Sequence, residues 1–345
     1  MIGANVSAFS IGKAVGRGGG GGLYPFTSFT FSHGIAGARV PSGVGISPRN
    51  TTRGNYVYGN TKSEFLTLYD TTNNPWLNNA SFYEVEGAGN GVQKWTVPSS
   101  GDYKFTLKGA AGGNQIGSGS IAGKGVEVIA TLSLTEGDII KMLVGKRGEN
   151  TDSGAGNKNA GAGGGGGTFV FNLLSDSEPL LVAGGGGGSC KGSNGANGST
   201  STSGVVGVFS GEAGGTSGYK GGNSIDANYD SGSGAGWKNG NGEVTLGNNA
   251  TLGYAPKNGG WGGYRSADGQ DDWGGHGGFG GGGGGTTENG AGAGGGGYSG
   301  GGGGGGPSTY GGGGGGGSFI TSSATNTSSG VLSTVDHGSI LVQKL

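Results

Sequence analysis

The chain has 345 residues, of which 96 are glycine, far above the ordinary share of about 7%. Its formal net charge of −1 gives no basic footprint, which argues against nucleic acid as a partner. Cys190 is the single cysteine, which excludes an internal disulfide and a cysteine-based metal site, and no stretch approaches the roughly 18 apolar residues of a transmembrane helix.

The N-terminal region, residues 1 to about 80, is expected to be an extended arm with short elements. Residues 1–16 lack the basic start and the uninterrupted apolar core of a signal peptide, so we expect synthesis in a cytoplasm without export. Tyr24, Phe26, Phe29 and Phe31 form an irregular β-like pattern and are the residues predicted to attach this region to partner proteins.

From about residue 81 the pattern becomes that of β-strands. Residues 92–97 alternate, residues 98–101 form a turn, and residues 103–107 alternate again, which predicts a hairpin. Further strands are predicted at 126–134, 139–144, 169–174, 180–183, 319–320, 331–332 and 339–342, with 169–174 and 180–183 forming a second hairpin. No long segment has helical periodicity, so α-helix should be nearly absent.

Residues 184–317 form a glycine-rich region that interrupts this strand pattern. Because strand character resumes at Phe319, we expect the region to be an insertion within one β-fold, with its two ends close together. The predicted division is therefore 1–80 as the arm, 81–183 plus 318–345 as a β-sandwich, and 184–317 as the insertion.

The oligoglycine runs have two interpretations, a flexible linker or a packed bundle of polyglycine-II helices. Such a helix has three residues per turn, rises about 3.1 Å per residue and makes no internal hydrogen bond, so neighbouring helices satisfy one another's backbone groups. Ordering each residue costs about 1–2 kcal/mol, whereas each hydrogen bond contributes only about 0.5–1.5 kcal/mol. The bundle therefore needs a β scaffold, and we favour it because strand-like segments bracket the runs. Collagen is excluded, since strict Gly-X-Y repetition and abundant proline are missing.

Aromatic residues recur at period three among the glycines. Trp273, His276 and Phe279 follow this rule, as do Trp261 and Tyr264, so each set should line one edge of a three-residue helix. The rings either sheath the bundle and fill its seam with the β-domain, which we favour, or form an exposed recognition surface. The set to test for receptor contact is Trp237, Tyr254, Trp261, Tyr264 and Trp273, with loop anchoring as the alternative.

Several segments resemble a known family. These segments are similar, in collinear order, to the glycine-rich domain of the anaplastic lymphoma kinase and leukocyte tyrosine kinase receptors: Gly91–Tyr103, Lys108–Gly113, Gly125–Gly145, Gly163–Phe171, Gly277–Gly285, and Ser318–Ile320 with His337–Ile340. The resemblance covers roughly residues 82–345. It implies a tumour-necrosis-factor-like, jelly-roll β-sandwich that carries polyglycine helices.

The chain departs from those receptors, because it has no kinase, membrane span or signal peptide and almost no cysteine. Residues 25–31, Trp76, Phe82 and residues 92–98 look more like glycine-rich tail or fibre proteins of marine bacteriophages. The tip adhesins of T-even-type phages similarly use polyglycine helices as a platform for variable host-binding loops, a parallel of architecture rather than of motif.

No catalytic motif stands out. His33, His276 and His337 are dispersed, and the many GxGxxG matches follow from composition alone. Asp271 with Asp272, and Asp226 with Asp230, could bind a cation, but solvated turns are the favoured interpretation. We expect no enzyme activity, no cofactor and no metal.

The leading hypothesis is a bacteriophage virion structural protein, a tail-fibre or tail-tip component that acts in host recognition. Its expected location is the virion tail. Its expected partners are other tail proteins, through residues 1–80, and a host-surface glycan or protein. The alternatives are a purely structural tail or capsid subunit and an extracellular ligand-binding module, although the module predicts a signal peptide and disulfides.

Overall fold

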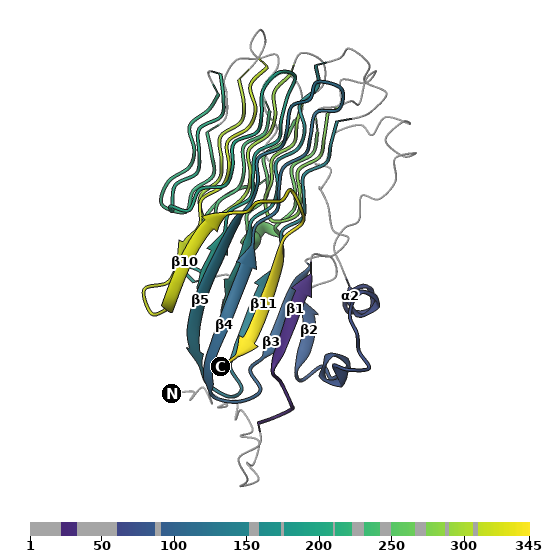
Figure 1. The fold of residues 1–345 in the computed structure, drawn as a ribbon, viewed down its shortest axis with the longest axis vertical. Helices are drawn as coiled ribbons and strands as arrows, with labels where there is room; N and C mark the ends of the chain where they lie inside the picture. The colour runs from purple at the N-terminus through teal and green to yellow at the C-terminus, as the bar shows by residue number, and fades with distance from the viewer. Residues whose placement is uncertain are drawn as a thin grey trace, which may run out of the picture.

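The computed structural model describes residues 22–32, 61–86, 91–151, 159–173, 176–209, 211–222, 231–241, 250–265, 274–286, 290–305 and 310–345. In this part of the chain two antiparallel β-sheets dominate and helix is nearly absent. Figure 1 shows the strands in the lower half of the molecule and the glycine-rich segments above them, where they continue in line with the strands.

The first sheet has five strands in the order β1-β11-β4-β5-β10, and the second has six in the order β2-β3-β6-β7-β8-β9. The first comprises β1 (Ser28–Ser32), β4 (Gly101–Lys108), β5 (Val126–Leu134), β10 (Thr325–Val331) and β11 (Ser339–Lys344). The second comprises β2 (Tyr83–Glu86), β3 (Val92–Thr96), β6 (Ile139–Leu143), β7 (Thr168–Phe171), β8 (Leu181–Ala183) and β9 (Phe319–Ile320). All-β architecture is confirmed at this level.

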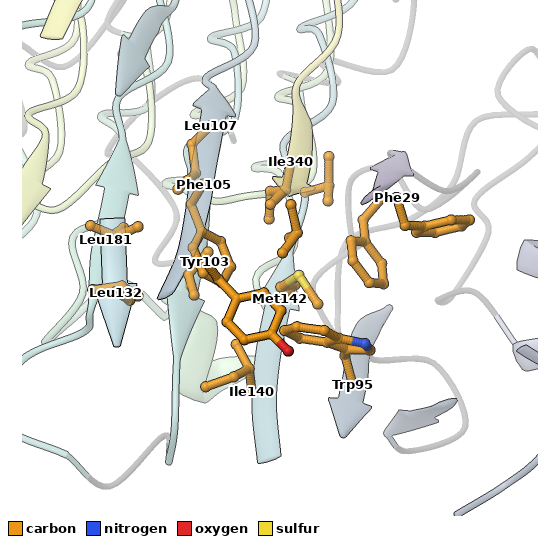
Figure 2. Close-up of a cluster of buried hydrophobic side chains, with 14 of the residues drawn as sticks. Phe29, Trp95, Tyr103, Phe105, Leu107, Leu132, Ile140, Met142, Leu181 and Ile340 are labelled. Atoms are coloured by element: carbon orange, nitrogen blue, oxygen red, sulfur yellow. The ribbon is translucent and has the colours of Figure 1, made fainter. Parts of the chain in front are cut away.

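The main hydrophobic core lies between the two sheets. Strand alternation sends Tyr103, Phe105 and Leu107 of β4 to one face, while Ile140 and Met142 of β6 come from the opposing sheet. Figure 2 shows these side chains pointing toward one another, together with Trp95 of β3 and Leu181 of β8. Burying such rings and aliphatic chains contributes about 1.5–3 kcal/mol each, so this core stabilises the body.

The predicted hairpin between residues 92–97 and 103–107 is wrong. β3 pairs with β2 and β6, whereas β4 pairs with β5 and β11, so the turn at Pro98–Gly101 carries the chain from one sheet to the other. The rings of Trp95 and Tyr103 meet edge to face, with centroids 5.6 Å apart, across the core. Apolar alternation fits both arrangements equally, and the core contact decides between them.

The described part of the expected arm lies within this body. β1 pairs with β11 from Ser28↔Gln343 to Ser32↔Ser339, which makes it an edge strand of the first sheet. The helix α2 (Lys62–Leu68) starts with a capping box, and the 3-10 turn η1 (Pro75–Asn78) contributes buried side chains to the core. The expectation of an extended arm is therefore wrong for residues 22–32 and 61–80, which pack into the body as a strand, a helix and a 3-10 turn. Among the described helices, none has the length and apolar character needed to span a bilayer.

The described residues of the glycine-rich segments 109–125, 144–167 and 184–318 form a second tier, called here the glycine tier. Each begins where a strand ends, as at β8, and returns to another strand, as at β9 (Figure 1). β8 and β9 are paired, with Leu181↔Ile320 and Val182↔Phe319 in register. The expectation that the two ends of the long insertion lie together is therefore confirmed.

Within the tier, hydrogen bonds run between segments and return to the same neighbour every three residues. The segment 184–188 shows this for four successive donors: Gly185 N to Gly296 O, Gly186 N to Ala110 O, Gly187 N to Ala196 O and Gly188 N to Ala293 O, at 2.8–2.9 Å. The first and fourth donors reach the same segment, while the second and third reach two others. Three segments, 163–167, 184–188 and 294–297, also bond one another in a closed triangle.

This packing leaves no room for side chains. A Cβ built on Gly164 would overlap the carbonyl oxygen of Gly294, and one on Gly185 would overlap that of Gly165. The obstacle in both cases is the backbone of a neighbouring segment, which is itself held by hydrogen bonds. The oligoglycine runs are thus required by close backbone approach rather than by turns.

At the margin of the tier, where a segment has no further segment beside it, side-chain oxygens accept the hydrogen bonds that backbone carbonyls accept in the interior. Among the described residues of the tier, backbone N–H groups donate to Oδ1 atoms of asparagine in five pairs at 2.5–2.9 Å: Asn114 to Asn150, Ile121 to Asn194, Ala122 to Asn114, Lys124 to Asn197 and Lys220 to Asn239. Hydroxyls do the same, as where Gly312 N donates to Ser193 Oγ at 2.9 Å. Backbone donors that would otherwise be left unbonded at the margin are satisfied in this way.

A second hydrophobic cluster, called here the seam cluster, joins the tier to the outer face of the six-stranded sheet. Phe169 and Phe171 of β7 point to this face while Val170 points to the main core, so both faces of β7 are buried. The tier contributes Trp237, Tyr254, Trp261, Phe279 and Tyr298. The ring of Trp237 lies 5.3 Å from that of Phe171, centroid to centroid.

Gly164→Ala should lower the free energy of unfolding by about 3 kcal/mol, because its methyl group would meet a fixed backbone. Gly330→Ala in β10 is the matched control, since a Cβ there meets no atom within 4 Å. That control should be neutral or slightly stabilising. Chemical denaturation followed by tryptophan fluorescence measures both, and equal effects would contradict the close packing.

Candidate functional site

The aromatic residues predicted for receptor contact lie inside the molecule wherever the structure describes them. Trp237, Tyr254 and Trp261 are only 3%, 7% and 6% exposed and belong to the seam cluster, while Tyr264 is fully buried. Trp273 lies outside the described residues. The burial favours loop anchoring, the alternative left open by the sequence, because buried rings offer no surface to a receptor.

The period-three aromatics pair across two neighbouring segments. Trp261 contacts Phe279 with ring centroids 5.8 Å apart, and Tyr264 contacts His276 at 4.8 Å. Each segment contributes two rings three residues apart. The rings therefore face a neighbouring segment and help to hold the tier together.

The residues predicted for attachment are mostly core residues. Phe29 and Phe31 are buried between the sheets, and Phe26 packs against the ring of Trp95 at 5.1 Å. Tyr24 donates its hydroxyl to Thr96 O at 2.5 Å. Its ring borders a hollow of about 460 Å³ that is also lined by Pro25, Pro75, Trp76 and Phe82.

At the distal end of the tier, remote from the sheets, two aromatic residues from distant parts of the chain adjoin hydrogen-bonded segments. Val208 N donates to Gly312 O at 2.8 Å, and Val208 O accepts from Gly305 N at 3.3 Å. Phe209 directly follows Val208 and Tyr310 directly precedes Gly311, so the two residues extend from neighbouring segments of the tier. Phe209 is 54% exposed.

Both residues have a backbone conformation that bulky side chains rarely adopt. The φ angle is 49° at Phe209 and 46° at Tyr310, in the left-handed region. Such strain costs of the order of 1–3 kcal/mol per residue, and glycine would remove it. In a chain with 96 glycines, an aromatic residue at each of these positions points to a use for the ring.

A cation and further apolar side chains lie at the same end. Lys191 Nζ is 5.9 Å from the ring centre of Tyr310, within range of a cation–π interaction. Ile121 is 54% exposed and donates its N–H to Asn194 Oδ1 at 2.9 Å, in the turn next to Lys191. We call Lys191, Phe209 and Tyr310 the distal tip; its aromatic faces and cation suit stacking and hydrogen bonding more than catalysis.

The single cysteine of the tier and the histidines His276 and His337 are held in place by burial and hydrogen bonds. Cys190 is fully buried, donates its thiol to Gly290 O at 2.7 Å, and has its pKa raised to about 12 by burial, which leaves it unreactive. His276 and His337 each accept a backbone N–H at Nδ1, from Arg265 and Arg147, at 3.1 Å. Within the described ranges, no cluster of acidic, histidine or cysteine side chains suits a metal ion; Asp226, Asp230, Asp271, Asp272 and His33 lie outside them.

Sequence reasoning missed the distal tip. Tyr310 directly precedes the run 311–317, Phe209 lies between Val208 and Ser210, and neither shows the period-three pattern that drew attention to the buried rings. The available signal was position, since each is an isolated aromatic residue in the glycine-rich region, away from a predicted strand.

No protein-family model matches the chain.

His276 provides a test of this buried network. Burial lowers its pKa from the ordinary 6.5 to about 4; Glu149 opposes this shift and Arg265 adds to it. The unfolded chain therefore binds the proton first, and stability should fall as pH decreases from about 6.5 to about 4, by roughly 3 kcal/mol in full.

His276→Asn keeps an acceptor for Arg265 N and removes the titration, so its stability should fall less than that of the parent across this range. Denaturant midpoints at pH 7, 5.5 and 4.5 compare the two proteins. Equal pH dependence would show that His276 is not the buried neutral group described here.

Proposed function

We propose that the chain is a structural protein of a bacteriophage tail, a fibre or tip component that contributes to host recognition. In this proposal the two sheets form a tumour-necrosis-factor-like, jelly-roll sandwich, and the glycine tier is a bundle of polyglycine-II helices. The region of residues 1–80 attaches to other tail proteins, with β1 built into the sandwich.

The hydrogen-bond pattern supports the polyglycine-II assignment. Donors in residues 185–188 return to the same neighbour after three residues, which is the repeat of a helix with three residues per turn. The ring pairs Trp261–Phe279 and Tyr264–His276 follow the same repeat. Their agreement favours this conformation over extended strands, whose side chains alternate at period two.

The observation that carries the recognition role is the distal tip. Phe209 and Tyr310 keep aromatic rings on strained left-handed backbone in neighbouring segments of the tier, with Lys191 beside them. Strain of this kind is retained where the surrounding structure imposes it and is concentrated at functional sites. The hydrogen-bonded segments that carry Phe209 and Tyr310 also lower the entropy lost on binding, because they hold the backbone next to both rings.

Burial of Trp237, Tyr254 and Trp261 in the seam cluster favours the second candidate, a purely structural tail or capsid subunit. In that role the rings fix the tier to the sheet and no surface contacts the host. The two candidates share the fold and differ only in the use of the distal tip.

Phe209→Asn and Tyr310→Asn test the proposal. Asparagine tolerates left-handed backbone, so both variants should fold with unchanged or slightly higher stability. Each should weaken binding of the purified protein to host cells by about tenfold or more, as truncation of an aromatic contact does.

Leu68→Gln in α2 is the control, since Leu68 is a 51% exposed apolar side chain in the other half of the molecule. Binding should persist in this control. Undiminished binding by both tip variants, with the protein present in purified virions, would support the purely structural role. Absence of the protein from virions would refute both candidates.

A further inference from the structure

Three turns of the glycine-rich insertion, none of which belongs to the distal tip, meet at a small polar hollow. Its volume is about 210 Å³, and its lining comprises three lysines and three asparagines around Gly240: Lys220, Lys238, Lys257, Asn239, Asn241 and Asn258. The chain as a whole is nearly neutral, with 20 basic and 21 acidic residues. This local excess of cations therefore stands out. We call these six side chains the lysine cup.

The backbone of the lysine cup is fixed by hydrogen bonds between its own turns. Asn239 Oδ1 accepts from Lys220 N at 2.5 Å, and Lys238 N donates to Gly218 O at 2.8 Å. Asn258 Nδ2 donates to Gly240 O at 2.7 Å, which joins the turn η3 (Pro256–Asn258) to the turn that contains Gly240. The site is thus formed before any ligand arrives.

The charge of the cup favours an anion. The lining contains no carboxylate among the described residues, and Glu178 approaches from outside it, with Oε1 3.0 Å from Lys238 Nζ. That pair orients Lys238 and offsets one of the three positive charges. The two lysines that this ion pair leaves in the lining, Lys220 and Lys257, give the cup a net positive charge that attracts an anion.

An exposed aromatic ring lies next to the cup. Tyr219 is 53% exposed, and Lys238 Nζ is 6.0 Å from its ring centre. The turn that presents it includes Ser217 at φ 54° and Gly218 at φ 87°, both left-handed. An aromatic face beside amides and cations is the combination that binds a sugar ring through its C–H face, its hydroxyls and its acidic group.

We propose that the lysine cup binds an acidic monosaccharide unit of a surface polysaccharide. The sugar carboxylate contacts the lysine ammonium groups, asparagine amides bond the hydroxyls, and the sugar ring lies against Tyr219. The hollow is smaller than the roughly 300–1,000 Å³ pockets of drug-sized ligands, which suits one sugar unit with the polymer continuing into solvent. The site does not depend on the tail role or on the distal tip.

The test is direct binding of D-glucuronate to the purified full chain, measured by isothermal titration calorimetry, with D-glucose as the neutral sugar control and sulfate as an anion without a sugar ring. Glucuronate should bind saturably, glucose should bind at least about tenfold more weakly, and added salt should weaken glucuronate binding. Lys220→Gln and Lys257→Gln should each reduce affinity about fivefold to tenfold, since each removes a charged partner.

Lys104→Gln in β4 is the matched control and should bind like the parent. Tyr219→Ala should weaken glucuronate binding and leave sulfate binding unchanged.

Absence of saturable glucuronate binding, equal binding of glucose, or unaltered affinity in both cup variants would overturn the proposal. Sulfate binding as tight as glucuronate binding, with no effect of Tyr219→Ala, would overturn the saccharide assignment and leave a simple anion site. Cell adsorption is not the readout, so the outcome is independent of the proposed tail function.

Discussion

The hydrogen bond between the backbones of neighbouring glycine segments is the interaction on which this structure depends. It forms at 2.8–2.9 Å around residues 184–188 only because no Cβ stands between the segments. Alanine is tolerated in the tier where its methyl group finds space, as at Ala110 and Ala293, both of which are buried. Glycine is thus required in these runs because the packed interior has no space for a Cβ. The runs are ordered by this packing and do not act as a flexible linker.

A packed glycine tier must be held at its ends, against the sheet and at its margin, and different parts of the chain do each of these. The strands hold the ends of the segments, since β8 and β9 pair where the long insertion begins and ends. The seam cluster, with Trp237 and Phe279, covers the outer face of the six-stranded sheet. Asparagine and hydroxyl side chains close the margin, and the turns between segments are left to carry residues that packing does not need. The distal tip and the lysine cup both lie in such turns.

Much of the fold could be predicted from the sequence, because strand alternation is local. The strand at Val126–Leu134 and the pairing of residues 168–170 with 181–183 follow from it. Partners distant in the chain could not be predicted: β1 meets β11 at the opposite end of the chain, and β3 and β4 separate into different sheets. β10 has a polar sequence and every residue exposed, so its pairing with β5, rather than an apolar pattern, makes it a strand.

The candidate site was harder to predict for a related reason. Period three identified Trp261 and Tyr264 correctly as residues on one edge, but it could not say whether that edge faces solvent or another segment. The strain at Phe209 and Tyr310 is a property of backbone angles, which composition does not reveal. Likewise, the lysines of the cup are far apart in sequence and meet only because three turns of the insertion are adjacent.

Amide hydrogen exchange of the glycine runs tests the central account most directly. If segments 184–188 and 294–297 are hydrogen-bonded within a packed tier, their amides should exchange as slowly as those of β4 and β5, with protection lost only on sub-global or global opening. Exchange of these amides at the rate of an unstructured chain, while β4 and β5 stay protected, would contradict the account and make the runs a flexible linker.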